Sequence, residues 1–274
     1  MDEQIVEFVR SRLLQIEDEH KVKILYAVES GSRAWGFESR DSDYDIRFIY
    51  AHKKEWYLNI LPKRDVIEYP IVDDFDYSGW DLRKALFLMN KSNPVLFEWL
   101  RSPIVYFRDD FFYDTMTRLS KKYFYPVSSV YHYLHMADGN YRHYLQEDFV
   151  KIKKYFYVLR PVLACMWIEY FKEPPPMEFE KLLVQITAND LLTAINELLA
   201  KKKSGIELGT EPKIEIINLF IEDRLRHFET SVNSFDPKKK PNQNLLEEGF
   251  IDILRYLENL DIGLVRQLRT FGSG

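Results

Sequence analysis

The sequence predicts an α+β fold, in which a mixed sheet with covering helices over about residues 1–105 is followed by an all-α region over residues 106–274. Two patterns predict this fold. Apolar and polar residues alternate in short runs between residues 21 and 77, as in strands, whereas from about residue 108 onward apolar residues recur at helical spacing. Because 46% of the 274 residues are hydrophobic, the chain can bury a core, and a wholly disordered protein is excluded.

The N-terminal part begins with an amphipathic helix and a strand. Apolar residues between positions 5 and 16 recur at the spacing of one helix face. Residues 21–28 are a predicted strand, and it ends in the turn Glu29-Ser30-Gly31-Ser32. Small residues in such a turn expose backbone N–H groups, so we interpret this segment as a candidate anion-binding turn.

A second strand is predicted at residues 44–50. Its bulky apolar residues alternate strictly with Asp43, Asp45 and Arg47, so these three polar side chains share one face. Two further strands are expected, at residues 65–72 and 74–77.

The remainder of the chain reads as helices. Two short helices are expected at 80–90 and 94–100, the second beginning at Pro94, a residue favoured at helix starts. Loop breaks are expected at 173–176, which contains three prolines, and at 234–242. The other predicted helices are 109–122, 128–145, 149–171, 189–203, 214–230 and 244–260.

Composition narrows the classes of function. The single cysteine, Cys165, excludes an intramolecular disulfide, and no run of about 18 uncharged apolar residues is present, so we expect a cytoplasmic protein without a membrane span. The net charge of −5 disfavours a protein that coats long nucleic acids. The lysine clusters at 201–203 and 238–240 are interpreted as solvated surface.

Asp43 and Asp45 are the candidate metal ligands. Two residues apart on a strand, their carboxylates leave one face and converge, which is unfavourable unless a cation lies between them. Magnesium accepts such oxygen ligands and keeps its other positions for water and substrate phosphates. A phosphate held at Gly31 and Ser32 would face that ion. The alternative is a polar turn beside a solvent-facing strand edge.

A third carboxylate is needed if two metal ions are to be held. Asp76, on the later predicted strand 74–77, is the preferred candidate. Asp74 shares its face and ranks second, ahead of Asp73 and Asp81. Asp81 is more simply interpreted as an acid in the first turn of the following helix.

These motifs resemble the DNA polymerase β nucleotidyltransferase superfamily. More narrowly, the chain resembles the predicted nucleotidyltransferases linked to RNA repair, the family that includes the YcgL-type proteins. The resemblance extends over about residues 20–270. It is carried by 31–50 (GSRAWGFESRDSDYDIRFIY), 78–82 (SGWDL), 91–100 (KSNPVLFEWL) and 153–161 (KKYFYVLRP).

The resemblance implies a polymerase β-like palm over residues 1–105 that transfers a nucleoside monophosphate from a nucleoside triphosphate. Asp43, Asp45 and Asp76 would bind two Mg²⁺ ions, with Mn²⁺ as a substitute, and Gly31 and Ser32 would hold the β and γ phosphates. The acceptor implied by the family's name is an RNA 3′ end. Adenylylation of a protein or a small molecule is the alternative acceptor chemistry, and a catalytically silent nucleotide-binding or scaffolding protein is the alternative of another class.

Cationic side chains complete the predicted nucleotide site. Arg47 is either a phosphate ligand or a salt-bridge partner of a neighbouring carboxylate, and Arg33 is a weaker phosphate candidate. On the helix 149–171, the face shared by Lys153, Tyr157 and Arg160 would close over the triphosphate, or alternatively covers core aromatics. Its candidates are Lys153, Lys154, Tyr157 and Arg160.

Overall fold

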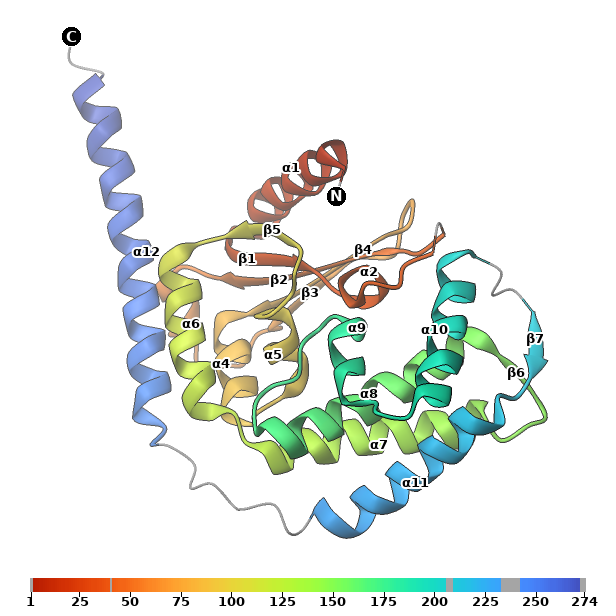
Figure 1. Ribbon diagram of the computed structural model, residues 1–274. Helices are drawn as coiled ribbons and strands as arrows, with labels where there is room; N and C mark the ends of the chain where they lie inside the picture. Colours follow the sequence, from red (N-terminus) through yellow and green to blue (C-terminus); the bar gives the residue numbers. More distant parts are fainter. Residues whose placement is uncertain (1, 40, 206–208, 233–241, 272–274) are drawn as a thin grey trace.

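The structure is a computed structural model that describes residues 2–39, 41–205, 209–232 and 242–271, with side chains up to residue 260. A mixed five-stranded sheet lies at its centre, in the order β3-β4-β2-β1-β5 (Figure 1). The β2–β4 pair is parallel and the other neighbours are antiparallel. The strands are β1 (Lys23–Glu29), β2 (Tyr44–Ala51), β3 (Val66–Glu68), β4 (Phe75–Asp81) and β5 (Val105–Arg108).

Helices cover both faces of this sheet. Helix α1 (Glu3–His20) lies on one face, and its buried stripe Val9, Leu13 and Ile16 packs on strand residues such as Ile24 (Figure 1). The opposite face is covered by α4 (Leu82–Asn90), α5 (Pro94–Trp99) and α6 (Asp110–Tyr123). The loops between strands carry the short helices α2 (Gly31–Trp35) and α3 (Lys54–Tyr57).

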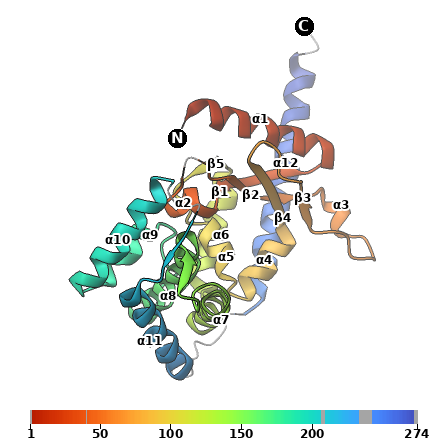
Figure 2. The ribbon, with the colours of Figure 1, turned by 90° about the vertical axis from the view of Figure 1, so that its right-hand side faces the viewer.

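The C-terminal part is mainly helical and packs beneath the sheet on the same side as α4 and α5 (Figure 1). Its central pair is α7 and α8, and α10 stands with its C-terminal end toward α2 (Figure 2). The elements are α7 (Pro126–Tyr144), β6 (Phe149–Lys151), α8 (Ile152–Phe171), α9 (Phe179–Leu182), η1 (Leu183–Gln185), α10 (Asn189–Lys203), β7 (Thr210–Pro212), α11 (Glu215–Ser231) and α12 (Asn244–Phe271).

Helix α12 returns to the N-terminal part of the chain. It runs beside α6, where the Tyr256 hydroxyl donates to Asp109 Oδ2 at 3.0 Å and the Tyr256 ring stacks on Phe111 (Figure 1). One apolar cluster extends from Leu25 of β1 to Leu254 of α12. The packing of the two parts of the chain is therefore continuous.

The predicted fold class is confirmed, because a mixed sheet with helices is followed by a helical C-terminal region. Several expected boundaries were wrong. Residues 149–151 form β6, which pairs with the unanticipated β7, and α8 begins only at Ile152. Trp80 and Asp81 end β4 instead of beginning a helix, and the strand expected over 65–72 is limited to 66–68.

Strand β5 was also not expected, and it lies across the predicted division at residue 105. That division stays a prediction. The lysine cluster 238–240 and most of the loop break 234–242 lie outside the described residues. Among the helices that the structure describes, none is long and apolar enough to cross a membrane.

Candidate active site

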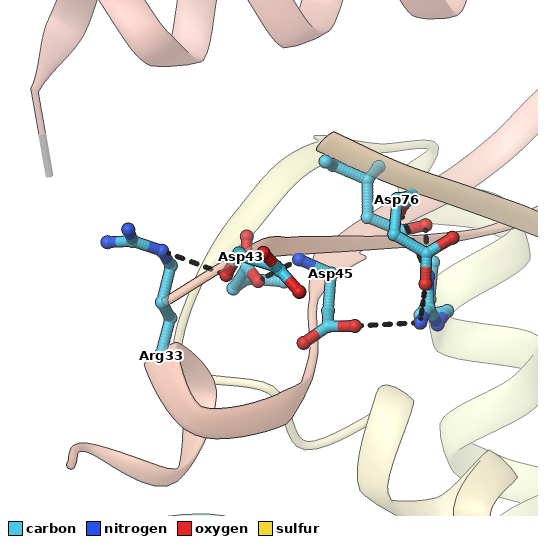
Figure 3. Close-up of polar contacts among 7 residues, drawn as sticks. Arg33, Asp43, Asp45 and Asp76 are labelled. Atoms are coloured by element: carbon cyan, nitrogen blue, oxygen red, sulfur yellow. Dashed lines mark hydrogen bonds and ion pairs between the residues drawn. The ribbon is translucent and has the colours of Figure 1, made fainter. Parts of the chain in front are cut away.

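Strands β2 and β4 bring two of the predicted carboxylates together. Their parallel register places Asp45 opposite Asp76, and the side chains lie on the same face (Figure 3). Asp43 precedes β2 and is exposed. Asp74 contributes its backbone carbonyl, which accepts from the Tyr44 N–H at 2.7 Å. Of the two acids considered first for the third position, Asp76 is the one aligned with Asp45.

Arg47 lies between these two aligned carboxylates. Its Nη2 donates to Asp45 Oδ1 at 2.8 Å and to Asp76 Oδ2 at 2.6 Å, and its Nη1 donates to the Asp76 carbonyl at 3.0 Å. The arginine side chain is 18% exposed. Of the two interpretations of Arg47, the structure therefore contains the salt bridge, in which one guanidinium compensates the charge of two carboxylates.

Glu29, the last residue of β1, is a member of the site that the sequence reading did not single out. It is fully buried; its Oε1 accepts from the Asp45 N–H at 2.6 Å and its Oε2 from the Tyr106 hydroxyl. Burial raises the pKa of Glu29 to about 7. The available signal was a charged residue at the end of an otherwise apolar strand, which by itself does not show burial.

The pKa of Asp45 is set by its burial and by the charged groups around it. Burial is the largest cause that raises the pKa of Asp45, and the neighbouring charges of Asp76 and Asp43 raise it further. Arg47 acts in the opposite direction. The carboxylate is therefore held in a place where a nearby cation stabilises its ionised form.

Gly31 is required by the close approach of the turn to Asp45. Its φ of +56° is a left-handed conformation, and a Cβ at this position would lie 1.9 Å from Asp45 Oδ2. The Ser30 N–H donates to the Asp45 carbonyl at 2.9 Å, which fixes the turn against β2. The sequence Glu-Ser-Gly-Ser thus places the start of α2 directly beside the carboxylate.

A pocket of about 510 Å³ opens between this turn, the segment before β2 and the helical region. Its lining brings together acids, cations, hydroxyls and aromatic rings from distant parts of the chain. The lining residues are Ser30, Gly31, Ser32, Trp35, Phe37, Ser39, Asp41, Ser42, Asp43, Asp45, Arg47, Lys153, Tyr157 and Lys202. Lys202 was expected to be solvated, and this expectation was wrong: the residue is 7% exposed.

The predicted cationic face of α8 reaches the pocket only in part. Lys153 and Tyr157 line it, whereas the Lys154 ammonium lies over the rings of Tyr144 and Tyr157, 3.9 Å and 4.8 Å from their centroids. Lys154 is not among the lining residues.

Arg160 does not line the pocket, so the structure does not support it as a direct nucleotide contact. It is buried, donates to Glu98 Oε1 at 2.9 Å and lies over the Trp35 ring. Arg160 follows Lys153 by about two helical turns, roughly 10 Å along the axis. At that distance along α8 the same helix face is buried in the core.

Arg33 braces the segment that carries Asp43. Its guanidinium donates to the Asp43 carbonyl at 3.1 Å (Figure 3) and to the Ser42 carbonyl at 2.7 Å, and it lies over the Tyr44 ring at 3.7 Å from the centroid. These contacts use backbone acceptors and an aromatic face. Arg33 therefore positions the acidic segment, and it is absent from the pocket lining.

The three predicted metal ligands differ in their surroundings. Asp43 and Asp45 both line the pocket and supply the hard oxygen ligands that Mg²⁺ prefers. Within the described part of the chain, no group of three His, Cys, Asp or Glu side chains is placed to hold a metal together. Asp76 is paired with Arg47. A second ion at Asp76 requires that arginine to move.

Comparison with known proteins identifies the family of this chain. The family model described as RlaP, the RNA repair pathway DNA polymerase beta family, matches residues 5–252. The chain belongs to this family. It is therefore a member of a nucleotidyltransferase-like family assigned to a predicted RNA repair pathway, as the sequence motifs indicated.

Two individual proteins illustrate the relationship. The YcgL protein of Bacillus subtilis (strain 168), described as uncharacterized, is 52% identical over 229 residues, which cover 83% of this chain and 88% of that protein. A crystal structure of a nucleotidyltransferase-like protein from Exiguobacterium sibiricum 255-15 aligns with 80% of this chain and 75% of its own, at 10% identity and a TM-score of 0.34.

Proposed function

We propose that the protein is a magnesium-dependent nucleotidyltransferase that moves a nucleoside monophosphate from a nucleoside triphosphate to a hydroxyl acceptor. One observation carries the proposal: Asp43, Asp45 and the Gly31-Ser32 turn line the same pocket as lysines from the helical region. Carboxylates suit a metal, and a glycine turn with lysines suits phosphates. The family assignment supports the same class of reaction.

The roles follow from the chemistry of the residues that line the pocket. Asp43 and Asp45 would hold Mg²⁺, which supplies charge stabilisation to the phosphates during transfer. Gly31 and Ser32 bind the β and γ phosphates through backbone N–H groups, and Lys153 neutralises phosphate charge from α8. With Mn²⁺ in place of Mg²⁺ the same oxygen ligands serve.

Two further groups keep the ligands in position. Glu29 accepts from the Asp45 N–H at 2.6 Å, so it fixes the backbone of a metal-binding residue without entering the pocket. Asp76 is the third carboxylate, paired with Arg47 beside Asp45. Its role in binding a second ion depends on release of Arg47 toward the pocket that this arginine already lines.

The acceptor we propose is an RNA 3′ end. Support comes from the RNA repair pathway in the family's description. The described pocket residues recognise phosphate and metal, and they do not themselves select RNA over a protein or small-molecule hydroxyl. Experiment must therefore decide whether the acceptor is an RNA 3′ end, a protein or a small molecule.

The test is transfer of label from each of the four α-³²P ribonucleoside triphosphates to a pool of RNAs, with Mg²⁺ and with EDTA. We expect labelled RNA only with the metal, and a loss of at least about 100-fold in Asp45→Asn, since transition-state charge stabilisation of this kind is worth several kcal/mol. Asp74→Asn is the matched control, because Asp74 has a φ of +66° that asparagine tolerates and gives only a backbone contact to β2.

Three other results would each lead to a different conclusion. Label in protein but never in RNA replaces the RNA acceptor with a protein acceptor. Full transfer by a folded Asp45→Asn variant contradicts the metal-ligand assignment. Triphosphate binding that is tight, insensitive to magnesium and without pyrophosphate release favours a silent nucleotide-binding protein.

A further inference from the structure

Three consecutive lysines at the end of α10 have different surroundings. Lys201 Nζ pairs with Glu211 at 2.5 Å and Lys203 Nζ pairs with Glu180 at 2.8 Å; their side chains are 47% and 43% exposed. Lys202, between them, is 7% exposed. Successive residues of a helix point about 100° apart, so only the middle lysine faces inward.

Lys202 continues the apolar stripe with which α10 packs. The stripe consists of Leu191, Ile195 and Leu198, all buried, and Lys202 follows Leu198 by four residues. A leucine at position 202 would satisfy that packing. Burial of an ammonium group costs free energy unless polar or charged partners surround it, so the surroundings of the Lys202 head decide what this residue does.

The head of Lys202 reaches the segment that leads to the metal-binding acids. Lys202 Nζ donates to Ser39 Oγ at 3.1 Å, and Ser39 Oγ lies 3.1 Å from Ser42 Oγ. Ser42 directly precedes Asp43. The contact joins α10 to residues more than 150 positions earlier in the chain, and Figures 1 and 2 both show the end of α10 near α2.

The acids and the lysines of the pocket come from different elements, and Arg47, the cation on β2, is paired with Asp45 and Asp76. Asp41, Asp43 and Asp45 come from β2 and the segment before it, whereas Lys153 comes from α8 and Lys202 from α10. A metal-bound polyphosphate has the complementary arrangement, because the metal meets the carboxylates and the remaining phosphate charge needs cations. Lysine serves there as a point charge that can contact phosphate while another of its three donors binds a hydroxyl.

We propose that Lys202 is a nucleotide-binding residue, whose ammonium contacts the terminal phosphates of a nucleoside triphosphate in the pocket while it also binds Ser39. The bound triphosphate then joins the helical region to the loop that carries Asp43. This assignment rests on the proposed function and adds a residue to it from a helix outside the sheet.

The test compares Lys202→Met with Lys201→Met and Lys203→Met in the full-length protein. The probes are the α,β-methylene analogues of the four ribonucleoside triphosphates and the corresponding monophosphates, titrated calorimetrically with Mg²⁺. For Lys202→Met we expect triphosphate affinity to fall about 10- to 100-fold, the effect of one hydrogen bond to a charged group, and monophosphate affinity to change less than about threefold. Both control variants should bind within about threefold of the wild type, because their partners are surface carboxylates.

Methionine has the length and shape to fit the apolar stripe, and thermal unfolding of Lys202→Met checks that the variant is folded. If it does not fold, Lys202→Gln, which keeps a donor for Ser39 and removes the charge, gives the same comparison. Triphosphate affinity equal to that of Lys201→Met overturns the proposal, as does an equal loss for mono- and triphosphates, which indicates a displaced loop. A wild type that binds no triphosphate overturns the proposed function as well, so the two failures are distinguishable.

Discussion

Replacing Arg47 by methionine removes the cation that Asp45 and Asp76 share. Arg47, Asp45 and Asp76 have side chains 18%, 27% and 25% exposed, so the cluster is mostly but not fully removed from water. Breaking a fully buried pair costs about 3–5 kcal/mol, and breaking an exposed pair costs less than about 1 kcal/mol. We therefore expect the free energy of unfolding of Arg47→Met to fall by about 2 kcal/mol, and its melting temperature by about 4–8 °C.

Magnesium should reverse part of this loss. In the variant, two aligned carboxylates are left without their guanidinium, so a divalent cation gains a site that Arg47 otherwise fills. Urea unfolding with and without Mg²⁺ should show a larger metal-induced stabilisation in Arg47→Met than in the wild type. Calorimetric titration of Mn²⁺ gives an independent measure of the same difference.

Arg64→Met is the control for loss of an ion pair as such. Arg64 pairs with Glu68 four residues later, but its side chain is 71% exposed, so its removal should cost less than about 0.5 kcal/mol. Equal stabilities of Arg47→Met and Arg64→Met, or a magnesium effect identical in variant and wild type, would refute this account of the cluster.

Two further predictions concern the site, and a third concerns the core beside it. Gly31→Ala should abolish most transfer activity, because its Cβ would collide with a carboxylate oxygen of Asp45. The control is Gly36→Ala, where φ is +80° and a Cβ would meet no atom within 4 Å; this variant should lose about 1 kcal/mol of stability and keep its activity. As the pH rises from 4.5 to about 7, the wild type should lose about 3 kcal/mol of unfolding free energy relative to the Glu29→Gln variant. The reason is that the Glu29 pKa is raised in the folded protein, so the folded protein binds more protons than the unfolded chain in this interval. Arg160→Met should cost about 3–5 kcal/mol in urea unfolding, because it leaves the buried Glu98 carboxylate without its cation, although the Tyr133 hydroxyl still donates a hydrogen bond to it.

Each of these three predictions can be contradicted by a specific result. Transfer by Gly31→Ala at the level of Gly36→Ala would show that the turn does not need to approach Asp45. Parallel stability curves for the wild type and Glu29→Gln between pH 4.5 and 7 would exclude Glu29 as the titrating group. Stability of Arg160→Met equal to the wild type would show that the Glu98 pair is not structural.

The centre of the site was predictable because strand periodicity is a local property. Alternation placed Asp45 and Arg47 on one face of β2, and an acid on the next strand could be expected beside them. The structure adds the register that aligns Asp45 with Asp76. Gly31 was identified from the turn, although the collision that excludes a side chain appears only in three dimensions.

Sequence reasoning misplaced those residues whose surroundings are set by tertiary packing. Lys202 and Arg160 lie on helix faces whose periodicity was recognised, but whether a cation ends in a pocket, in the core or in water is set by what packs against that face. Glu29 ends an apolar strand, and its burial depends on Tyr106 of β5, which was not expected. Short strands such as β5 and β6 carry too few residues to show a period.

A crystal structure with Mn²⁺ and an α,β-methylene triphosphate tests the central assignment most directly, because the anomalous signal locates the metal without reference to activity. The account predicts a manganese peak within bonding distance of carboxylate oxygens of Asp43 and Asp45, with the phosphates against Gly31 and Ser32. A peak elsewhere, or a triphosphate bound away from this turn, would contradict it.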